Sequence, residues 1–119
     1  FNNFIHFNKR IMEHKDIDTV TFKNLIDNDS IVLIDVRTPE EYSDGHLQNA
    51  THIDFHHEDF EELIDELDKR KKYLVYCRSG NRSRQAMFLM RDLGFEEVYN
   101  LSEGINSWIE LDFPVEQPD

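Results

Sequence analysis

Cysteine, proline and glycine are scarce in this sequence, whose 119 residues include one cysteine, three prolines and four glycines. A single cysteine cannot form an intramolecular disulfide, so folding does not require an oxidising compartment and the thiol of Cys77 is free to react. We therefore expect a cytoplasmic protein. No apolar run approaches the roughly 18 residues of a membrane span, so we expect no membrane as a partner of this chain.

Basic residues are also few, 13 against 25 acidic ones, and the formal net charge is −12. A strongly negative protein repels the phosphate backbone of nucleic acids, so nucleic acid is excluded as an expected partner. One short stretch departs from this pattern and could draw small anions, because it contains four arginines: Arg78, Arg82, Arg84 and Arg91.

The chain contains no internal repeat, low-complexity tract or linker rich in glycine, serine or proline. We predict an N-terminal arm over residues 1–18 and a single domain over residues 19–119. A domain of this length can bury roughly two thirds of its unfolded surface, and the 39% hydrophobic content is sufficient for one core.

Strands and helices alternate along the predicted domain. Aliphatic runs predict buried strands over residues 31–36 and 73–76, with shorter strands over 50–54 and 98–101. Five helices are predicted between and beside them: one capped by Thr21, one starting at Thr38, one with Phe60, Leu63, Ile64 and Leu67 facing the core, one over 83–93 and one over 105–111. The pattern indicates an α/β fold with a mainly parallel central sheet of about five strands, flanked by helices on both faces.

A polar loop follows the predicted strand over residues 73–76, and it begins with Cys77. Ligands of open parallel sheets bind beyond the carboxyl ends of the strands, which is where this loop lies. Gly80 and Asn81 tolerate the backbone angles that let successive N–H groups converge on one centre. These donors, the dipole of the following helix and the charges of Arg78 and Arg82 all favour a thiolate at Cys77.

Cys77 and a group of histidines each have a purely structural interpretation as well. An isolated cysteine at a strand end is often a small buried hydrophobe, but the next residues, arginine, serine, glycine, asparagine and arginine, favour a reactive thiol. His52, His56 and His57 lie close together in the sequence, yet their spacing matches no strong zinc signature. We therefore expect no metal and no cofactor.

The segment from Cys77 to Ser83, Cys-Arg-Ser-Gly-Asn-Arg-Ser, resembles the active-site loop of single-domain rhodaneses, the thiosulfate sulfurtransferases. Residues 34–37 with 41–50 are similar to the first signature of that family, and residues 103–115 are similar to its last. The resemblance covers roughly residues 19–115. Glu103 and Asp112 depart from it, since they stand where the family usually has glycine.

The resemblance implies a rhodanese-like fold and sulfur transfer by double displacement. Cys77 would take a sulfane sulfur from thiosulfate or a related small anionic donor and pass it to a thiol, a protein acceptor or cyanide. The substrate-binding residues would be those of the loop: Arg78, Ser79, Gly80, Asn81, Arg82 and Ser83. Arg78 and Arg82 would attract the donor, while Asp35 and Arg37 would brace neighbouring loops.

Two other functions stay open. Phosphatases and arsenate reductases resemble the same fold, but such phosphatases place five residues between cysteine and arginine, whereas four separate Cys77 from Arg82. A non-catalytic interaction module could also use this fold, because function resides in the site and not in the fold.

Overall fold

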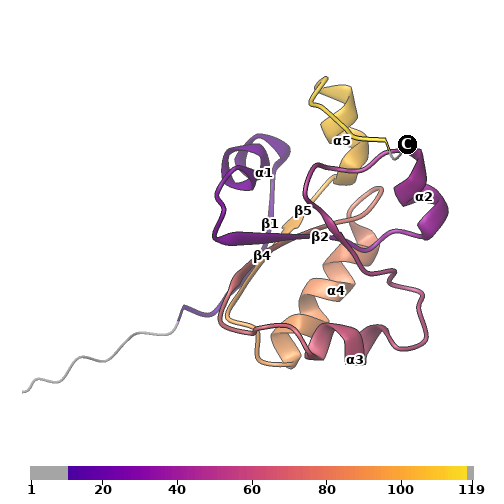
Figure 1. Ribbon diagram of the computed structural model, residues 1–119. Coiled ribbons are helices and arrows are strands. Elements are labelled where there is room, and N and C mark those ends of the chain that lie inside the picture. The colour runs from indigo at the N-terminus through magenta and orange to yellow at the C-terminus, as the bar shows by residue number, and fades with distance from the viewer. Residues whose placement is uncertain (1–10, 118–119) are drawn as a thin grey trace, which may run out of the picture.

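The computed structural model describes residues 11–117 and contains a five-stranded sheet in the order β1-β5-β4-β2-β3, with every neighbouring pair parallel (Figure 1). The strands are β1 (Glu13–Ile17), β2 (Ile31–Asp35), β3 (Thr51–His52), β4 (Lys72–Tyr76) and β5 (Glu97–Leu101). The predicted parallel α/β fold is therefore confirmed, and β4 lies at the centre of the sheet, so the loop that follows it emerges at mid-sheet.

Helices cover both faces of this sheet. They are α1 (Thr19–Ile26), α2 (Pro39–Asp44), α3 (Phe60–Asp65), α4 (Asn81–Asp92) and α5 (Gly104–Glu110). Because side chains alternate along a strand, β4 sends Tyr73 and Val75 into the core beneath α3 and α4, and sends Leu74 and Tyr76 into the core beneath α1 and α5. The side chains of β4 are therefore buried on both faces of the sheet, as predicted.

The prediction of an arm over residues 1–18 is wrong for Glu13–Ile17, which forms the edge strand β1. This strand pairs with β5 from Glu13 opposite Glu97 to Ile17 opposite Leu101. Its sequence, Glu-His-Lys-Asp-Ile, has one buried residue, Ile17, so no apolar pattern marks it as a strand. Backbone pairing stabilises it instead. Residues 1–10 of the arm lie outside the described residues.

Three helix predictions need correction. Helix α1 begins at Thr19 with Asp18 as its N-cap, because the Asp18 carboxylate accepts a hydrogen bond from the Thr21 backbone N–H at 2.8 Å. Helix α4 begins at Asn81, two residues before the prediction. Leu63 is 40% exposed and so lies outside the core in which we placed it, whereas Phe60 and Ile64 are buried there.

The start of α2 is confirmed in detail. Thr38 and Glu41 form a reciprocal capping box, in which each side chain bonds the backbone N–H of the other, and Pro39 occupies the first turn. This cap fixes the position of Glu41. In residues 11–117 no helix is long and apolar enough to cross a membrane.

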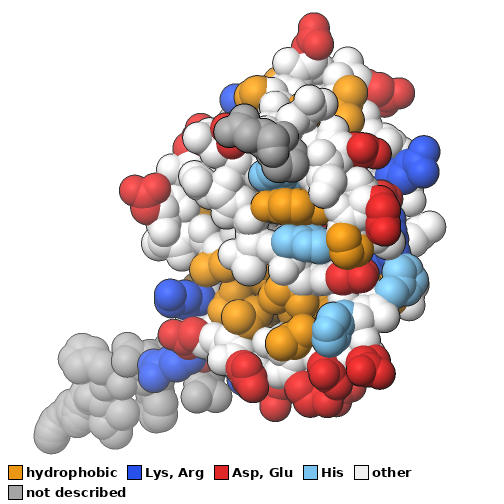
Figure 2. Space-filling model, turned by 45° about the vertical axis from the view of Figure 1, so that its right-hand side comes forward, with side chains coloured by type: hydrophobic (Ala, Val, Ile, Leu, Met, Phe, Trp, Pro, Cys, Tyr) orange, Lys and Arg blue, Asp and Glu red, His pale blue; other side chains and the backbone are white. Residues whose placement is uncertain are grey.

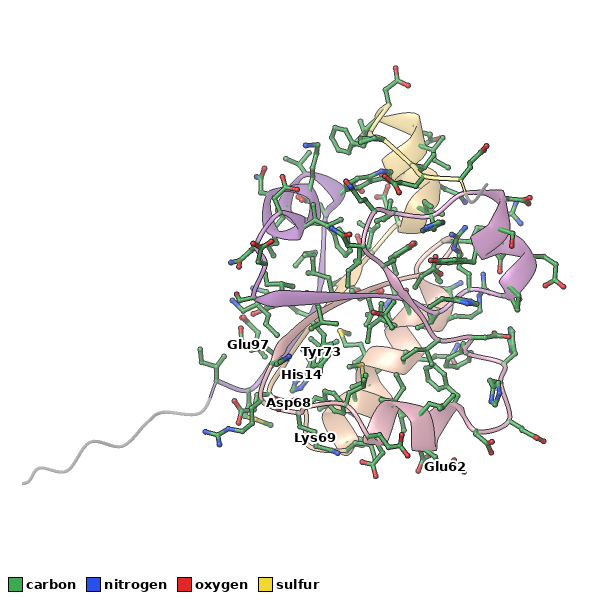
Figure 3. The ribbon with its side chains drawn as sticks, viewed as in Figure 1. His14, Glu62, Asp68, Lys69, Tyr73 and Glu97 are labelled. Carbon is green, nitrogen blue, oxygen red and sulfur yellow. The ribbon has the colours of Figure 1, made fainter. Side chains whose placement is uncertain are left out.

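The amino end of the sheet, opposite the Cys77 loop, holds polar contacts that join its connections to the strands (Figure 3). The Tyr73 hydroxyl donates to the Asp68 carbonyl oxygen at 2.6 Å, and Lys72 lies 3.6 Å from the Glu97 carboxylate. These contacts hold the amino end of the sheet together.

Candidate active site

Cys77 directly follows β4, and the loop after it leads into α4 with Gly80 as the N-cap. Gly80 has a φ of +102°, and a Cβ atom there would lie 2.2 Å from the carbonyl oxygen of Ser102. Only glycine fits such a position, because a side chain would be both strained and in collision. The Asn100 side-chain amide also donates to the Gly80 carbonyl oxygen at 3.2 Å, so β5 helps to hold the loop.

The sulfur of Cys77 accepts hydrogen bonds from the loop and from the first turn of α4. The Gly80 backbone N–H lies 3.1 Å from Sγ, and the Ser83 hydroxyl lies 3.3 Å from it. Cys77 has no exposed surface, and this burial alone would also fit a cysteine that only packs in the core. A sulfur that accepts hydrogen bonds differs from a packing residue, however, and this arrangement suits a thiolate.

Two opposing effects set the pKa of the Cys77 thiol. Burial disfavours the thiolate and would raise the pKa. Hydrogen bonds from the hydroxyl and backbone N–H of Ser83, and from the backbone N–H groups of Gly80 and Ser79, favour the thiolate and outweigh burial. The net result is a pKa below the ordinary value of a cysteine, so the site can hold a nucleophilic thiolate without a histidine base.

Arg82 does not face the sulfur as a free cation, because its guanidinium is held by Glu41 of α2. Its two terminal nitrogens lie 2.8 and 3.0 Å from the two carboxylate oxygens of Glu41. These bonds lower the pKa of Glu41 to about 2, and they raise the pKa of Arg82. The pair therefore stays ionised and links α2 to the start of α4, a contact that sequence reasoning missed.

The remaining predicted loop residues lie at the surface. Arg78, Ser79 and Asn81 are exposed, and the Asn81 side-chain oxygen accepts a hydrogen bond from Arg84 at 3.2 Å. Among residues 11–117, the Arg78 guanidinium has no hydrogen-bond or ion-pair partner. The seven predicted residues thus form one loop, but of its two predicted donor-attracting cations only Arg78 is unpaired.

Asp35 and Arg37 brace the site from below, as the sequence predicts, through both an ion pair and hydrogen bonds. The Arg37 guanidinium donates to the Asp35 carboxylate at 2.8 Å and to the Gly45 carbonyl oxygen at 2.6 Å. The Tyr76 hydroxyl also donates to Asp35 at 2.6 Å. This buried network ties the ends of β2 and β4 to α2, which carries Glu41.

Helix α5 packs its first turn against the loop. The backbone N–H groups of Ile105 and Asn106 donate to the carbonyl oxygens of Cys77 and Arg78 at 2.9 and 3.2 Å. Gly104 makes this approach possible, because a Cβ atom there would lie 2.2 Å from the Arg78 carbonyl oxygen. The sequence analysis gave Gly104 no role. The signal that could have identified it is its place next to Glu103, which departs from the family pattern.

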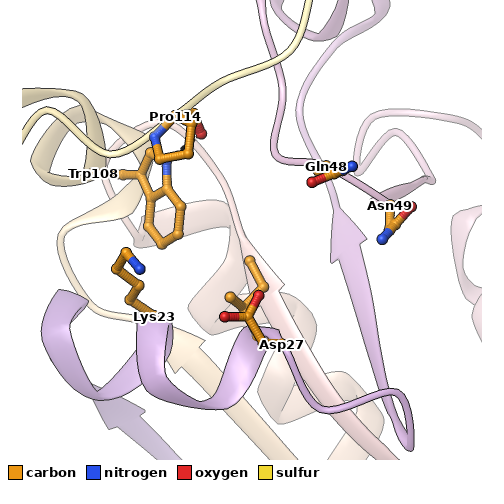
Figure 4. A pocket seen from close by; sticks show the side chains of 7 residues that line it. Lys23, Asp27, Gln48, Asn49, Trp108 and Pro114 are labelled. Atoms are coloured by element: carbon orange, nitrogen blue, oxygen red, sulfur yellow. Dashed lines mark hydrogen bonds between the residues drawn. The ribbon is translucent and has the colours of Figure 1, made fainter.

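A first pocket, of about 240 Å³, borders the loop and lies between α2, Arg78 and the start of α5. A second lies between α1, the connection at residues 48–49 and Trp108 of α5 (Figure 4). The second contains no residue of the Cys77 loop, so we place the candidate active site at the loop and the first pocket.

Comparison with known proteins shows the family to which the chain belongs. The model of the rhodanese-like domain family matches residues 18–111. The putative sulfurtransferase YtwF of Bacillus subtilis is 39% identical over 98 residues, covering 82% of this chain and 92% of the relative. The thiosulfate sulfurtransferase GlpE of Coxiella burnetii is 33% identical over 97 residues, covering 82% and 89%.

A longer relative and a solved structure complete the comparison. The tRNA uridine(34) hydroxylase of Cytophaga hutchinsonii is 40% identical over 94 residues, which cover 76% of this chain but 30% of that protein. The crystal structure of a rhodanese-related protein from Thermoplasma volcanium superposes with a TM-score of 0.77 at 31% identity, covering 88% of this chain and all of that chain. Sequence, fold and loop geometry agree, and the chain belongs to the rhodanese-like domain family.

Proposed function

We propose that this protein is a sulfurtransferase that moves a sulfane sulfur from thiosulfate or a related anionic donor to a thiol or cyanide, through a persulfide on Cys77. The observation that carries the proposal is the environment of the Cys77 sulfur, which accepts hydrogen bonds from Gly80 and Ser83 and has a lowered pKa. The similarity to a putative sulfurtransferase and to a thiosulfate sulfurtransferase supports the same chemistry.

The first half-reaction forms the persulfide. The Cys77 thiolate attacks the outer sulfur of thiosulfate, a new S–S bond forms, and the old S–S bond breaks so that its electron pair leaves with sulfite. The persulfide anion keeps one negative charge and sulfite carries two, which equals the charge of the reactants. No oxidant or metal enters the balance, so a lone nucleophile is sufficient.

The second half-reaction returns the enzyme to its starting state. Cyanide or a thiolate attacks the outer sulfur of the persulfide, and the S–S bond to Cys77 breaks with its electron pair on Sγ. The loop N–H groups and the Ser83 hydroxyl are positioned to hold negative charge on sulfur throughout, in the manner of an oxyanion hole.

A phosphatase or arsenate reductase is less well supported by the same loop. A phosphatase needs its arginine to grip the oxyanion, but the Arg82 guanidinium is engaged by both oxygens of Glu41. Four residues between Cys77 and Arg82 also give a smaller ring than those phosphatases have. A single sulfur atom suits that ring better than a phosphate group does.

Intact mass spectrometry tests the proposal directly. Because Cys77 is the one cysteine of the chain, thiosulfate should add one sulfur atom to the protein, and cyanide should remove it. Cys77→Ser is the matched control and should show no adduct, since a serine hydroxyl is not ionised at neutral pH. If neither thiosulfate nor a persulfide donor modifies the wild-type protein, the proposal is wrong.

A further inference from the structure

The pocket beside the Cys77 loop is lined by charged side chains of both signs, by polar Asn106 and by two isoleucines. Helix α2 contributes Glu41 and Asp44, the loop contributes Arg78, and α5 contributes the side chains of Ile105 and Ile109. Its volume of about 240 Å³ is below the roughly 300–1,000 Å³ of pockets for drug-sized ligands, so it suits a small molecule.

Two of the four charged residues that line this pocket are already neutralised by partners in the protein. Arg37 pairs with Asp35, and Glu41 pairs with Arg82 through both of its oxygens. Within residues 11–117, Arg78 and the carboxylate of Asp44 have no such partner. The pocket is therefore left with one available cation at the loop and one available anion on α2.

Cys77 does not line this pocket, but two of the lining residues, Arg78 and Ile105, adjoin its backbone. Arg78 follows Cys77 in the chain, and the N–H of Ile105 donates to the Cys77 carbonyl oxygen at 2.9 Å. A molecule bound between Arg78 and Asp44 is thus adjacent to the loop that holds the sulfur. Its apolar carbons would lie against Ile105 and Ile109, the latter 53% exposed.

We propose that this pocket binds the sulfur acceptor, and that the acceptor is a zwitterionic thiol of the amino-acid type, with its carboxylate on Arg78 and its ammonium on Asp44. This inference rests on the proposed function. A dianion such as thiosulfate finds one partner here and one repelling group, whereas a zwitterion finds a partner for each charge.

The transfer step requires no further reactant. The acceptor thiolate attacks the outer sulfur of the Cys77 persulfide anion, and the bond between the two persulfide sulfurs breaks. Its electron pair returns to Sγ as the thiolate, and the new small-molecule persulfide leaves as an anion, so the total charge is unchanged. One S–S bond replaces another, so there is no net oxidation or reduction.

The experiment uses persulfide-loaded protein and a series of acceptors that differ by one charge. Cysteine has both groups, cysteamine lacks the carboxylate and 3-mercaptopropionate lacks the ammonium. Discharge is followed by intact mass, and rate constants are compared per thiolate. We expect cysteine to exceed each analogue roughly two- to fivefold, the scale of an exposed ion pair.

Two variants make the test specific. Arg78→Gln should abolish the advantage of cysteine over cysteamine, and Asp44→Asn should abolish its advantage over 3-mercaptopropionate. Glu58→Gln is the matched control, because it removes one exposed charge from a residue that does not line the pocket and should leave both ratios unchanged.

The outcomes separate this inference from the proposed function. Loading by thiosulfate and discharge by cyanide are measured first for every variant. If loading succeeds but the three thiols discharge the persulfide at equal rates, the acceptor assignment is wrong and the sulfurtransferase proposal stands. The same conclusion follows if the rate ratios do not change in the Arg78 and Asp44 variants. If Cys77 takes no sulfur, both are overturned.

Discussion

Cys77 shows how a fully buried thiol can have a lowered pKa. Burial alone stabilises the neutral thiol, and it is the largest single effect on this group. The opposing hydrogen bonds are individually smaller but share one acceptor, the sulfur, and their sum lowers the pKa. The Ser83 hydroxyl is the one side-chain donor among them, so it is the donor that substitution can remove without altering the backbone.

Substitution of Ser83 by alanine should raise the pKa of Cys77. A lowered pKa means that the thiolate is populated above that pKa and is lost as the pH falls through it. Without the hydroxyl, the midpoint of sulfur loading should move upward by about one pH unit, so loading at pH values below the midpoint should slow by up to roughly tenfold. The measurement is the pH profile of thiosulfate loading, with alkylation by iodoacetamide as a second readout.

The matched control for this experiment is Ser43→Ala, which removes an exposed hydroxyl from α2. Both pH profiles of the control should coincide with the wild type. An unchanged midpoint in Ser83→Ala would show that the backbone donors alone determine the thiolate.

At the scale of elements, the sequence predicts the strands that local apolar patterns mark. The strands β2, β4 and β5 end within one residue of the predicted ranges, because aliphatic runs mark strands that are buried on both faces. Strand β1 was missed because its pairing with β5 uses backbone groups that no side-chain pattern reports.

The contacts that position the candidate site were harder to predict, because they join residues distant in the sequence. The pair of Glu41 and Arg82 spans 41 positions, and neither residue alone shows that the other will neutralise it. The loop motif identified Cys77 and its neighbours, but not the close packing of Gly104 against Arg78. Through that packing, α5 constrains the backbone of the Cys77 loop.

The junction of α5 with the loop should be intolerant of a methyl group. In Gly104→Ala, the new Cβ atom would meet the backbone of Arg78 and Ser79 at 2.2 to 2.6 Å, at a φ of +70°. The loop must move, so sulfur loading should fall at least tenfold, in line with the cost of a misplaced catalytic group. Intact-mass loading kinetics and the urea midpoint of unfolding measure the two effects.

Gly94→Ala is the control that separates the effect of backbone strain at a positive φ from the effect of displacing the Cys77 loop. Gly94 has a φ of +98°, but a Cβ atom there would meet only the flexible side chain of Lys69, at 3.9 Å. This variant should lose stability while its folded fraction keeps wild-type loading. Equal loading defects in both variants would contradict a specific role for the α5 junction.

The molecule as a whole is acidic, and this charge acts on any anionic substrate. Figure 2 shows acidic side chains distributed over much of the visible face and far fewer basic ones, consistent with the net charge of −12. Near the loop, Arg82 and Arg37 are paired with carboxylates, which leaves Arg78 against Asp44 and the Cys77 thiolate. The local charge is therefore not positive, contrary to what counting the arginines suggests.

This balance predicts that salt accelerates loading by thiosulfate. The Debye length shortens from about 30 Å at 0.01 M to about 8 Å at 0.15 M ionic strength, so salt screens the distant acidic residues from the dianion while Arg78 stays within reach. The second-order rate constant of loading should rise a few-fold over this range. Alkylation of Cys77 by iodoacetamide, a neutral reagent, is the control and should be insensitive to salt. A loading rate that falls with salt would mean that the arginines attract the donor despite their partners, as the sequence motif first suggests.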